Sequence, residues 1–156
     1  MRYLSGRLLL VSFLAGAPAL AAQGRPIRVD GIKPLAFGTI VAGTPVSVSR
    51  TDPVRAGQID LTAQPKHPII VQLSLPAAMN GPLGATMPLS FGANDGGFAA
   101  QGAINAQTAF DPRTTLVITN SQNGRSSVYL GGTTQPSFNQ PPGTYTGVIT
   151  LTVAYP

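Results

Sequence analysis

The most constraining feature of the sequence is its last segment, Gly143–Pro156. Apolar and threonine side chains alternate along it, which places Ile149, Leu151 and Val153 on one face of an extended chain. Residues of these types suit a pleated, half-buried surface. We therefore expect a strand that runs to the last residue and belongs to a sheet. Because Val148 makes the opposite face apolar as well, the pattern predicts a central strand rather than an edge strand.

The first 21 residues have the pattern of a secretory signal peptide. Arg2 and Arg7 form a basic start, residues 8–17 are apolar, and Ala19-Leu20-Ala21 matches an Ala-x-Ala cleavage site. The apolar run is too short to cross about 30 Å of hydrocarbon, which argues against a membrane anchor. We expect cleavage after Ala21 and export to the periplasm, the cell surface or the medium, with no stable membrane insertion of the mature chain.

Charge and cysteine content exclude several classes of protein. Loss of Arg2 and Arg7 would lower the formal net charge from +5 to +3, and the remaining basic residues are scattered. A nucleic-acid-binding surface needs clustered basic residues, so nucleic acid is not an expected partner. The absence of cysteine excludes disulfides, a lipoprotein anchor and thiolate metal sites.

The rest of the chain is typical of an all-β domain. Glycine (18) and proline (15) are frequent, and no window after residue 21 has the helical period. Turn residues separate short alternating segments at roughly 8–12-residue spacing, which favours a sandwich or barrel of about 7–9 strands. The expected strands are residues 35–41, 46–50, 57–64, 69–76, 87–91, 114–120, 126–132 and 143–156.

Two of the expected connections have the pattern of hairpins. Residues 57–64 and 69–76 are joined by Pro65-Lys66-His67-Pro68, and residues 114–120 and 126–132 are joined through Asn123-Gly124, a strong hairpin signal. Residues 92–111 combine turn residues with low complexity, so we expect a long loop or crossover there.

Residues 22–34 form a lead-in to the domain at 35–156. Ile27, Val29 and Gly31 alternate within it. One interpretation is a donor segment that completes the sheet of a neighbouring subunit by strand addition. The other is an ordinary first strand of a complete sandwich.

Several short motifs follow one another along the chain: Leu35–Ile40, Val71–Pro76 before Met87, Val128–Gly132, and the closing segment with Gly143, Tyr145, Gly147 and Tyr155. Their order resembles a family of short exported bacterial β domains of unknown function, which is similar to spore coat protein U domains and to chaperone–usher pilin subunits. The resemblance covers most of residues 35–156. It implies an immunoglobulin-like, pilin-like sandwich, a role as a surface or fimbrial building block, and related subunits or a periplasmic chaperone as partners.

The sequence offers no convincing catalytic, cofactor or metal site. His67 and Asp60 could act as a general base pair, but no nucleophile motif accompanies them, and an exposed turn is the favoured interpretation of His67. Asn94 and Asp95 provide too few oxygens for calcium and fit a turn better. Tyr145 has two structural interpretations, a hydroxyl that bonds nearby backbone or simple core packing.

The sequence therefore predicts an exported structural or adhesive protein, a pilin-like subunit without catalysis or cofactor. A self-contained binding module for a glycan or surface protein is the alternative, although the mature chain has no tryptophan and few aromatic residues. A small hydrolase that uses His67 and Asp60 is the third reading.

Overall fold

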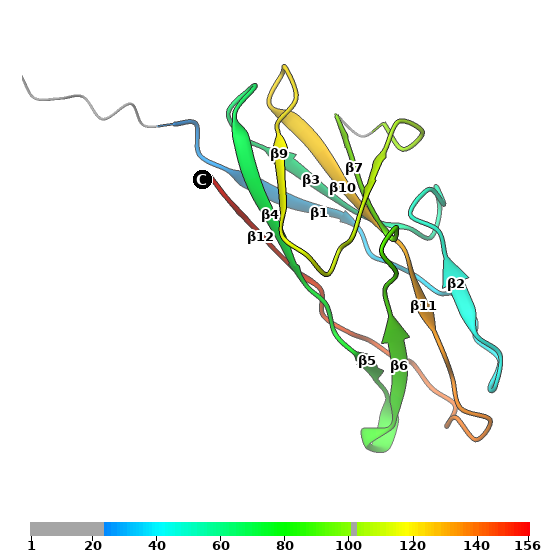
Figure 1. Cartoon of the computed structure of the whole chain (residues 1–156). Coiled ribbons are helices and arrows are strands. Elements are labelled where there is room, and N and C mark those ends of the chain that lie inside the picture. Colours follow the sequence, from blue (N-terminus) through cyan, green and yellow to red (C-terminus); the bar gives the residue numbers. More distant parts are fainter. Residues whose placement is uncertain (1–23, 101–102) are drawn as a thin grey trace, which may run out of the picture.

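The computed structural model describes residues 24–100 and 103–156 of the chain, so the predicted signal peptide at residues 1–21 lies outside the described residues. The described part is all-β, with twelve short strands in three antiparallel sheets that form a β-sandwich (Figure 1). This confirms the fold class predicted from the sequence. None of the described helical segments is long and apolar enough to span a membrane.

The sheets divide the molecule into an upper and a lower part in the view of Figure 1. The five-stranded sheet has the order β1 (Arg28–Lys33), β3 (Gly57–Thr62), β10 (Arg125–Leu130), β7 (Gly96–Ala100), β8 (Thr108–Phe110). The three-stranded sheet has the order β12 (Thr150–Ala154), β4 (Pro68–Ser74), β9 (Leu116–Thr119). The four-stranded sheet has the order β2 (Val46–Val48), β11 (Gly132–Thr134), β6 (Thr86–Ser90), β5 (Ala78–Asn80), and the short 3-10 turn η1 (Pro82–Gly84) joins β5 to β6.

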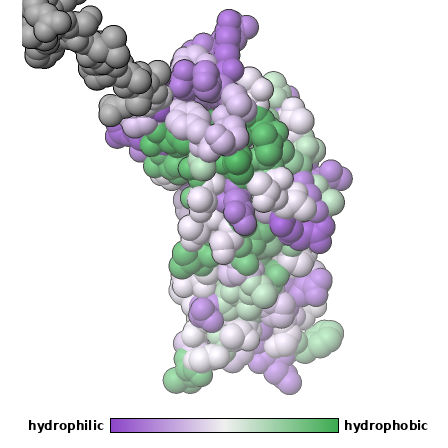
Figure 2. Space-filling model, turned by 60° about the vertical axis from the view of Figure 1, so that its left-hand side comes forward, coloured by the Kyte–Doolittle hydropathy of each residue, from purple (hydrophilic) through white to green (hydrophobic). Residues whose placement is uncertain are grey.

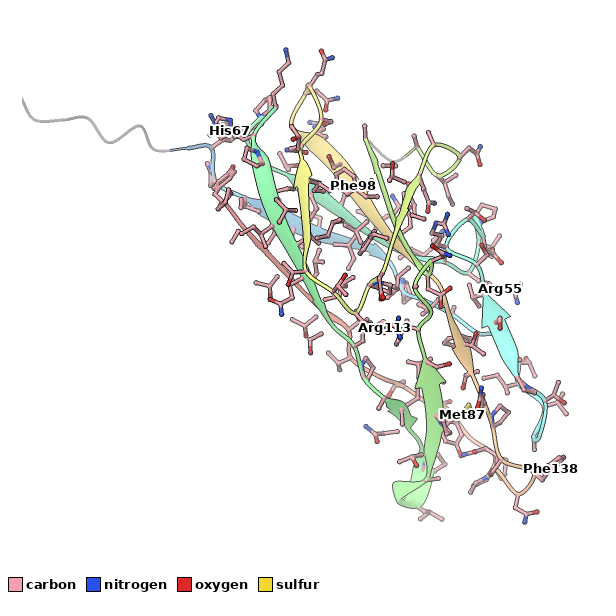
Figure 3. All side chains as sticks on the ribbon, viewed as in Figure 1. Arg55, His67, Met87, Phe98, Arg113 and Phe138 are labelled. Atoms are coloured by element: carbon pink, nitrogen blue, oxygen red, sulfur yellow. The ribbon has the colours of Figure 1, made fainter. Side chains whose placement is uncertain are left out.

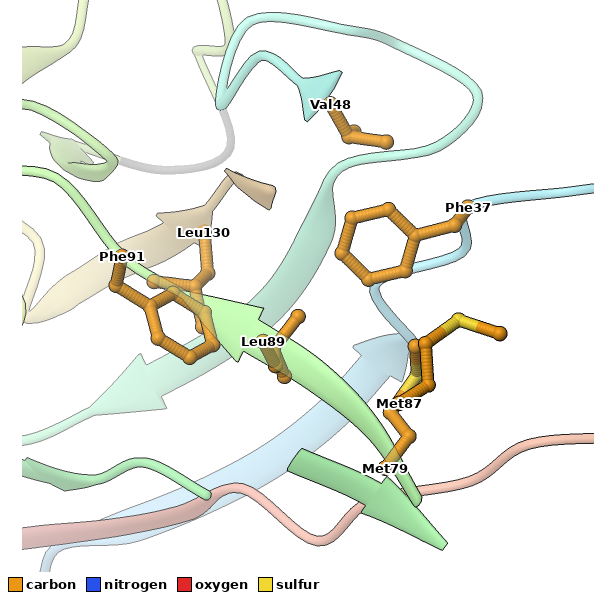
Figure 4. Packing of buried hydrophobic residues seen from close by; sticks show 7 residues of the cluster. All are labelled: Phe37, Val48, Met79, Met87, Leu89, Phe91 and Leu130. Carbon is orange, nitrogen blue, oxygen red and sulfur yellow. The ribbon is translucent and has the colours of Figure 1, made fainter. Parts of the chain in front are cut away.

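Two hydrophobic clusters fill the sandwich. The upper cluster lies between the five-stranded and three-stranded sheets and contains Leu61, Ala63, Ile69, Val71, Leu73, Phe110 and Val128. The lower cluster contains Phe37, Val48, Met79, Met87, Leu89, Phe91 and Leu130 (Figure 4). Leu75 and Ile149 pack against both clusters, so the two form one continuous core.

Both predicted hairpins are wrong, because each turn crosses from one sheet to another. β3 pairs with β1 and β10, whereas β4 pairs with β12 and β9. Likewise β9 pairs with β4, and β10 pairs with β3 and β7. The Asn-Gly turn is present, with Gly124 at φ 75°, and its carbonyl accepts a hydrogen bond from the Ala63 amide at 2.9 Å. The two crossing turns therefore bind each other rather than closing hairpins.

The expected strand at residues 35–41 is also wrong. Its backbone makes no ladder, although the Ala36 amide donates to the Arg55 carbonyl at 2.9 Å and Phe37 is buried in the lower cluster. Gly38 has φ 73°, a left-handed conformation that interrupts regular pairing. The segment contributes an aromatic side chain to the core without contributing a strand.

The sequence patterns missed strands in the regions expected to be loops. β7 and β8 lie within residues 92–111, and β5 lies within residues 77–86. Position 97 requires glycine, because a Cβ there would collide with the Gln107 and Arg50 side chains that cover this face of β7. Glycine is a poor strand former in general, and here this close packing explains its presence.

The closing segment is an edge strand, which corrects the prediction of a central position. Its strand is β12, and within the described part of the chain β12 pairs only with β4. Leu151 and Val153 face the upper cluster, and Thr150, Thr152 and Ala154 face solvent. Val148, the apolar residue on which the central position was predicted, is exposed rather than buried.

Candidate functional site

The candidate site is a groove between the two ends of the folded chain. β1 is the edge of the five-stranded sheet and β12 is the edge of the three-stranded sheet. A cavity of about 390 Å³ lies between β1 and the segment that leads into β12, lined on one side by Gly31–Leu35 and on the other by Gly147 and Ile149. We call this cavity the seam groove.

The floor of the seam groove is apolar. It is formed by Ile59 of β3, Leu73 of β4, and Val128 and Leu130 of β10. At Gly31 an added Cβ would meet no atom within 4 Å, so part of the groove is the space that a side chain at Gly31 would fill. A segment laid into the groove could bury apolar side chains on this floor.

A second cavity continues the seam toward the lower end of the molecule. It has a volume of about 660 Å³ and shares Leu35 with the seam groove. Residues 35–40 and Ala42 line one side of it and residues 140–145 line the other, with Met79 and Met87 between them. The gap between the N-terminal and C-terminal segments therefore extends along much of the sandwich.

The edge of β12 beside this gap lacks the usual protection against strand pairing. Natural edge strands carry lysine, other inward-pointing charges, proline or bulges that prevent a foreign strand from adding to them. Residues 147–155 contain none of the charged residues and no proline. Exposed Ile32 and Val148 flank the gap, and Figure 2, which brings this side forward, shows apolar surface at several levels of the molecule.

Two tyrosines of the closing segment close the gap at its ends. The Tyr155 hydroxyl donates to the Arg25 carbonyl at 2.6 Å and accepts from the Gln64 amide at 2.8 Å. The Tyr145 hydroxyl donates to the Pro141 carbonyl and accepts from the Gln140 side chain, both at 2.7 Å. Tyr145 thus bonds backbone four residues upstream while its ring packs on the lower cluster, which combines both interpretations from the sequence.

The predicted assembly segment is β1 in this structure. The alternating residues Ile27, Val29 and Gly31 lie on the core side, since Val29 pairs with Leu61 and Gly31 with Ile59. β1 is largely exposed and is held by one neighbouring strand. The segment is thus an edge strand of its own sandwich, and its role as a donor remains a prediction.

The remaining signature glycines fit close packing. Gly143 has φ 147°, and a Cβ at this position would collide with the Pro82 ring. A Cβ at Gly147 would lie 3.3 Å from the Pro76 ring, which is a tight contact. Gly147 therefore allows the closing segment to approach the β4–β5 connection, and Gly143 allows it to approach η1 between β5 and β6.

The residues considered for catalysis do not converge. The His67 ring lies edge-on to Tyr155 at the upper end of the molecule (Figure 3), with ring centroids 6.5 Å apart. The Asp60 carboxylate accepts from Ser127 Oγ at 2.6 Å and from Gln58 Nε2 at 3.0 Å on the outer face of the five-stranded sheet. Their hydrogen bonds and ring contacts thus serve separate parts of the sandwich.

The residues considered for calcium make a turn. The Asp95 carboxylate accepts from the Gly92 amide at 2.7 Å, and the Asn94 carbonyl accepts from Arg50 at 2.5 Å. No group of three or more histidine, aspartate or glutamate side chains with metal-binding geometry occurs in residues 24–100 and 103–156.

Beside Asp60 lies a buried tyrosine, Tyr129. Burial raises the pKa of its phenol, and the nearby Asp60 charge acts in the same direction. The neutral phenol is therefore the stable form at neutral pH. The arrangement is a polar layer on a sheet and provides no activated nucleophile.

The sequence singled out Gly31 and the closing segment but missed the floor of the groove. Alternation groups Ile59 with Leu61 in residues 57–64 and Leu73 with Val71 in residues 69–76, each pair on one face of its expected strand. It could not show that the two sheets would leave a gap above them, because that gap depends on which strands become edges.

Comparison with known proteins shows one family. Residues 27–155 match the model of a domain of unknown function, DUF4402, so the chain belongs to this family. No curated protein matches the chain. A solved family 123 glycoside hydrolase from Clostridium perfringens, described in connection with glycolipid glycan hydrolysis, is 16% identical with a TM-score of 0.39. The match covers 73% of this chain and 19% of that enzyme.

Proposed function

We propose that this member of the DUF4402 family is an exported, pilin-like structural subunit that joins a neighbouring chain by strand addition along the seam. The observation that carries this proposal is the apolar seam groove, which lies between β1 and the segment that leads into β12. In the described part of the chain, β1 and β12 are both sheet edges that pair on one side only. The protein has no catalytic role in this proposal.

Strand addition would pair the free backbone groups of β12 and bury apolar side chains of the added strand. The backbone N–H and C=O groups on the open side of β12 would pair with the added strand. Alternate side chains of that strand would enter the groove over Ile59, Leu73 and Leu130 and be removed from water. Backbone pairing supplies general affinity, and the shape of the groove selects the side chains.

The partner in this proposal is an extended segment of a related or identical subunit, or of a periplasmic chaperone that occupies the seam before assembly. Such a segment must alternate apolar residues, as the pattern at Ile27, Val29 and Gly31 does. When the donor is β1 of an identical chain, that β1 has to leave its own β3, where it contributes little buried side-chain surface.

The test compares two threonines on opposite edges of the three-stranded sheet. Thr152→Lys places a charge on the open edge of β12, and Thr119→Lys places the same charge on β9, with both threonines exposed. The purified mature protein is examined by size-exclusion chromatography with light scattering over a wide concentration range. Concentration-dependent oligomers are expected for the wild type and for Thr119→Lys, and monomers for Thr152→Lys.

A second variant fills the groove instead of charging its edge. Gly31→Val adds a side chain into open space without steric conflict, so the fold is expected to be retained. Oligomers should be lost in this variant while its circular dichroism spectrum stays that of the wild type. A wild-type protein that stays monomeric throughout, or equal loss of assembly in Thr119→Lys, contradicts strand addition at the seam.

A further inference from the structure

The charged residues of the described chain are confined to part of the fold. Lysine, arginine and aspartate occur only within residues 25–33, 50–66 and 95–125, and glutamate is absent. Three long stretches therefore carry no such charge: residues 34–49, 67–94 and 126–156.

The loops of these three stretches meet at the lower end of the molecule (Figure 1). The Gly43 amide donates to the Ser137 carbonyl at 3.0 Å, and Gln140 Nε2 donates to the Thr86 carbonyl at 3.1 Å. We call the surface formed by residues 41–45, 81–86 and 135–145 the uncharged end.

Each loop of the uncharged end exposes one large apolar side chain. Leu83 is fully exposed, Phe138 is 88% exposed, and Val41 is 66% exposed. Phe138 lies at the lower end in Figure 3, where its ring rests against Gly43. Leu83 has φ 54°, a strained conformation for leucine, and makes no compensating buried contact.

We infer that the uncharged end is an adhesive surface for a flat, uncharged, hydrocarbon-like surface. Contact with such a surface removes the three apolar tips from water and strips no charged group of its hydration. An anionic partner would find no basic side chain here, since the nearest charged segments lie outside the three loops. None of the three apolar tips lines the second cavity at this end, so they suit a flat surface better than a compact ligand, which needs a concave site.

This inference goes beyond strand addition, because a single subunit already carries the uncharged end. The test therefore uses the monomeric Thr152→Lys background, so that adsorption and assembly are measured independently. Should the wild type prove monomeric by itself, it takes the place of that background, and the failure of strand addition leaves this test intact.

The probe is a methyl-terminated alkanethiol monolayer, compared with a hydroxyl-terminated one and with phosphatidylcholine vesicles. Surface plasmon resonance measures equilibrium binding of the parent, of Leu83→Ser/Phe138→Ser, and of the control Val54→Ser/Val117→Ser. The control valines are 75% and 62% exposed but lie outside the uncharged end.

The parent and the control pair should bind the methyl surface equally, with no loss in high salt, and should bind the hydroxyl surface weakly. The Leu83→Ser/Phe138→Ser variant should bind at least about tenfold more weakly, since two exposed apolar contacts are lost. Equal binding of this variant and the control, equal binding to both monolayers, or a preference for the vesicles would overturn the inference.

Discussion

At the scale of single residues, Tyr155 ties together segments that are far apart in sequence. Its hydroxyl bonds the Arg25 carbonyl, near the start of the described chain, and the Gln64 amide in the turn after β3. Both bonds lie at the end of β12, beside the upper cluster. One hydroxyl thus closes the seam at its upper end.

We expect Tyr155→Phe to lower the free energy of unfolding by about 1–3 kcal/mol, because the part-buried Gln64 amide loses its acceptor. Urea unfolding monitored by circular dichroism measures this loss. His67→Ala is the control, since His67 contributes only an edge-on ring contact to Tyr155. Its effect should stay within about 0.5 kcal/mol, as is usual for surface substitutions. An equal loss of unfolding free energy in both variants would mean that the hydrogen bonds of the Tyr155 hydroxyl do not account for the stabilisation.

Acid sensitivity is also a residue-scale property of this chain. Hydrogen bonds from the Arg113 side chain and amide lower the pKa of the Asp111 carboxyl to about 2 from an ordinary value of 3.8. The pKa of Asp52 is lowered too, mainly by the amides of Arg55 and Val54. A depressed carboxyl pKa stabilises the fold fully above the unfolded-state value and progressively less as the pH falls toward the folded-state value.

The melting temperature should therefore fall as the pH is lowered from about 4 toward 2. In Asp111→Asn this fall should be smaller, because the substituted side chain does not titrate, and it should be smaller still in Asp52→Asn/Asp111→Asn. Differential scanning calorimetry across this range measures the slope. If the melting temperature of the double variant falls with pH as steeply as that of the wild type, Asp52 and Asp111 are not the source of the acid sensitivity.

At the scale of strands, the sequence predicted which face of a strand meets the core, but it did not predict which strands pair with each other. Alternation groups Ile59 with Leu61 in residues 57–64 and Val71 with Leu73 in residues 69–76, and these side chains line the groove or the upper cluster. A period of two residues identifies the face of a strand that meets the core. It carries no information about which strand lies alongside, and for this reason two crossing turns had the pattern of hairpins.

The turn signals themselves were correct in their local geometry. Gly124 adopts the left-handed conformation expected of an Asn-Gly pair, and Lys66 also has positive φ in the other crossing turn. The direction of the chain after each turn is set by the opposite sheet, which must cover the apolar face of the next strand. The position of β12 at an edge follows from the same pairing, and so does the seam groove that its sequence alone did not indicate.

At the scale of the whole molecule, one core joins an upper part that carries the charges and a lower part that carries the uncharged end. Leu75 and Ile149 bridge the two clusters, and β10 runs from Val128 in the upper cluster to Leu130 in the lower one. The proposed functions also divide along this axis, with the seam at the side and the adhesive surface at the lower end. A spectroscopic signal from the lower cluster should therefore respond to a change in packing in the upper cluster.

Methionine provides a probe of this coupling, because the mature chain expected after cleavage contains only Met79 and Met87, both in the lower cluster. Leu61→Ala removes buried side-chain volume from the upper cluster and should cost about 2–5 kcal/mol. When the core unfolds as one unit, the methionine methyl NMR signals should disappear at the same, lowered urea midpoint as the circular dichroism signal.

Val117→Ala, at an exposed site, should leave both midpoints unchanged. Methionine signals that persist beyond the circular dichroism midpoint in Leu61→Ala would show instead that the lower part unfolds independently of the upper part.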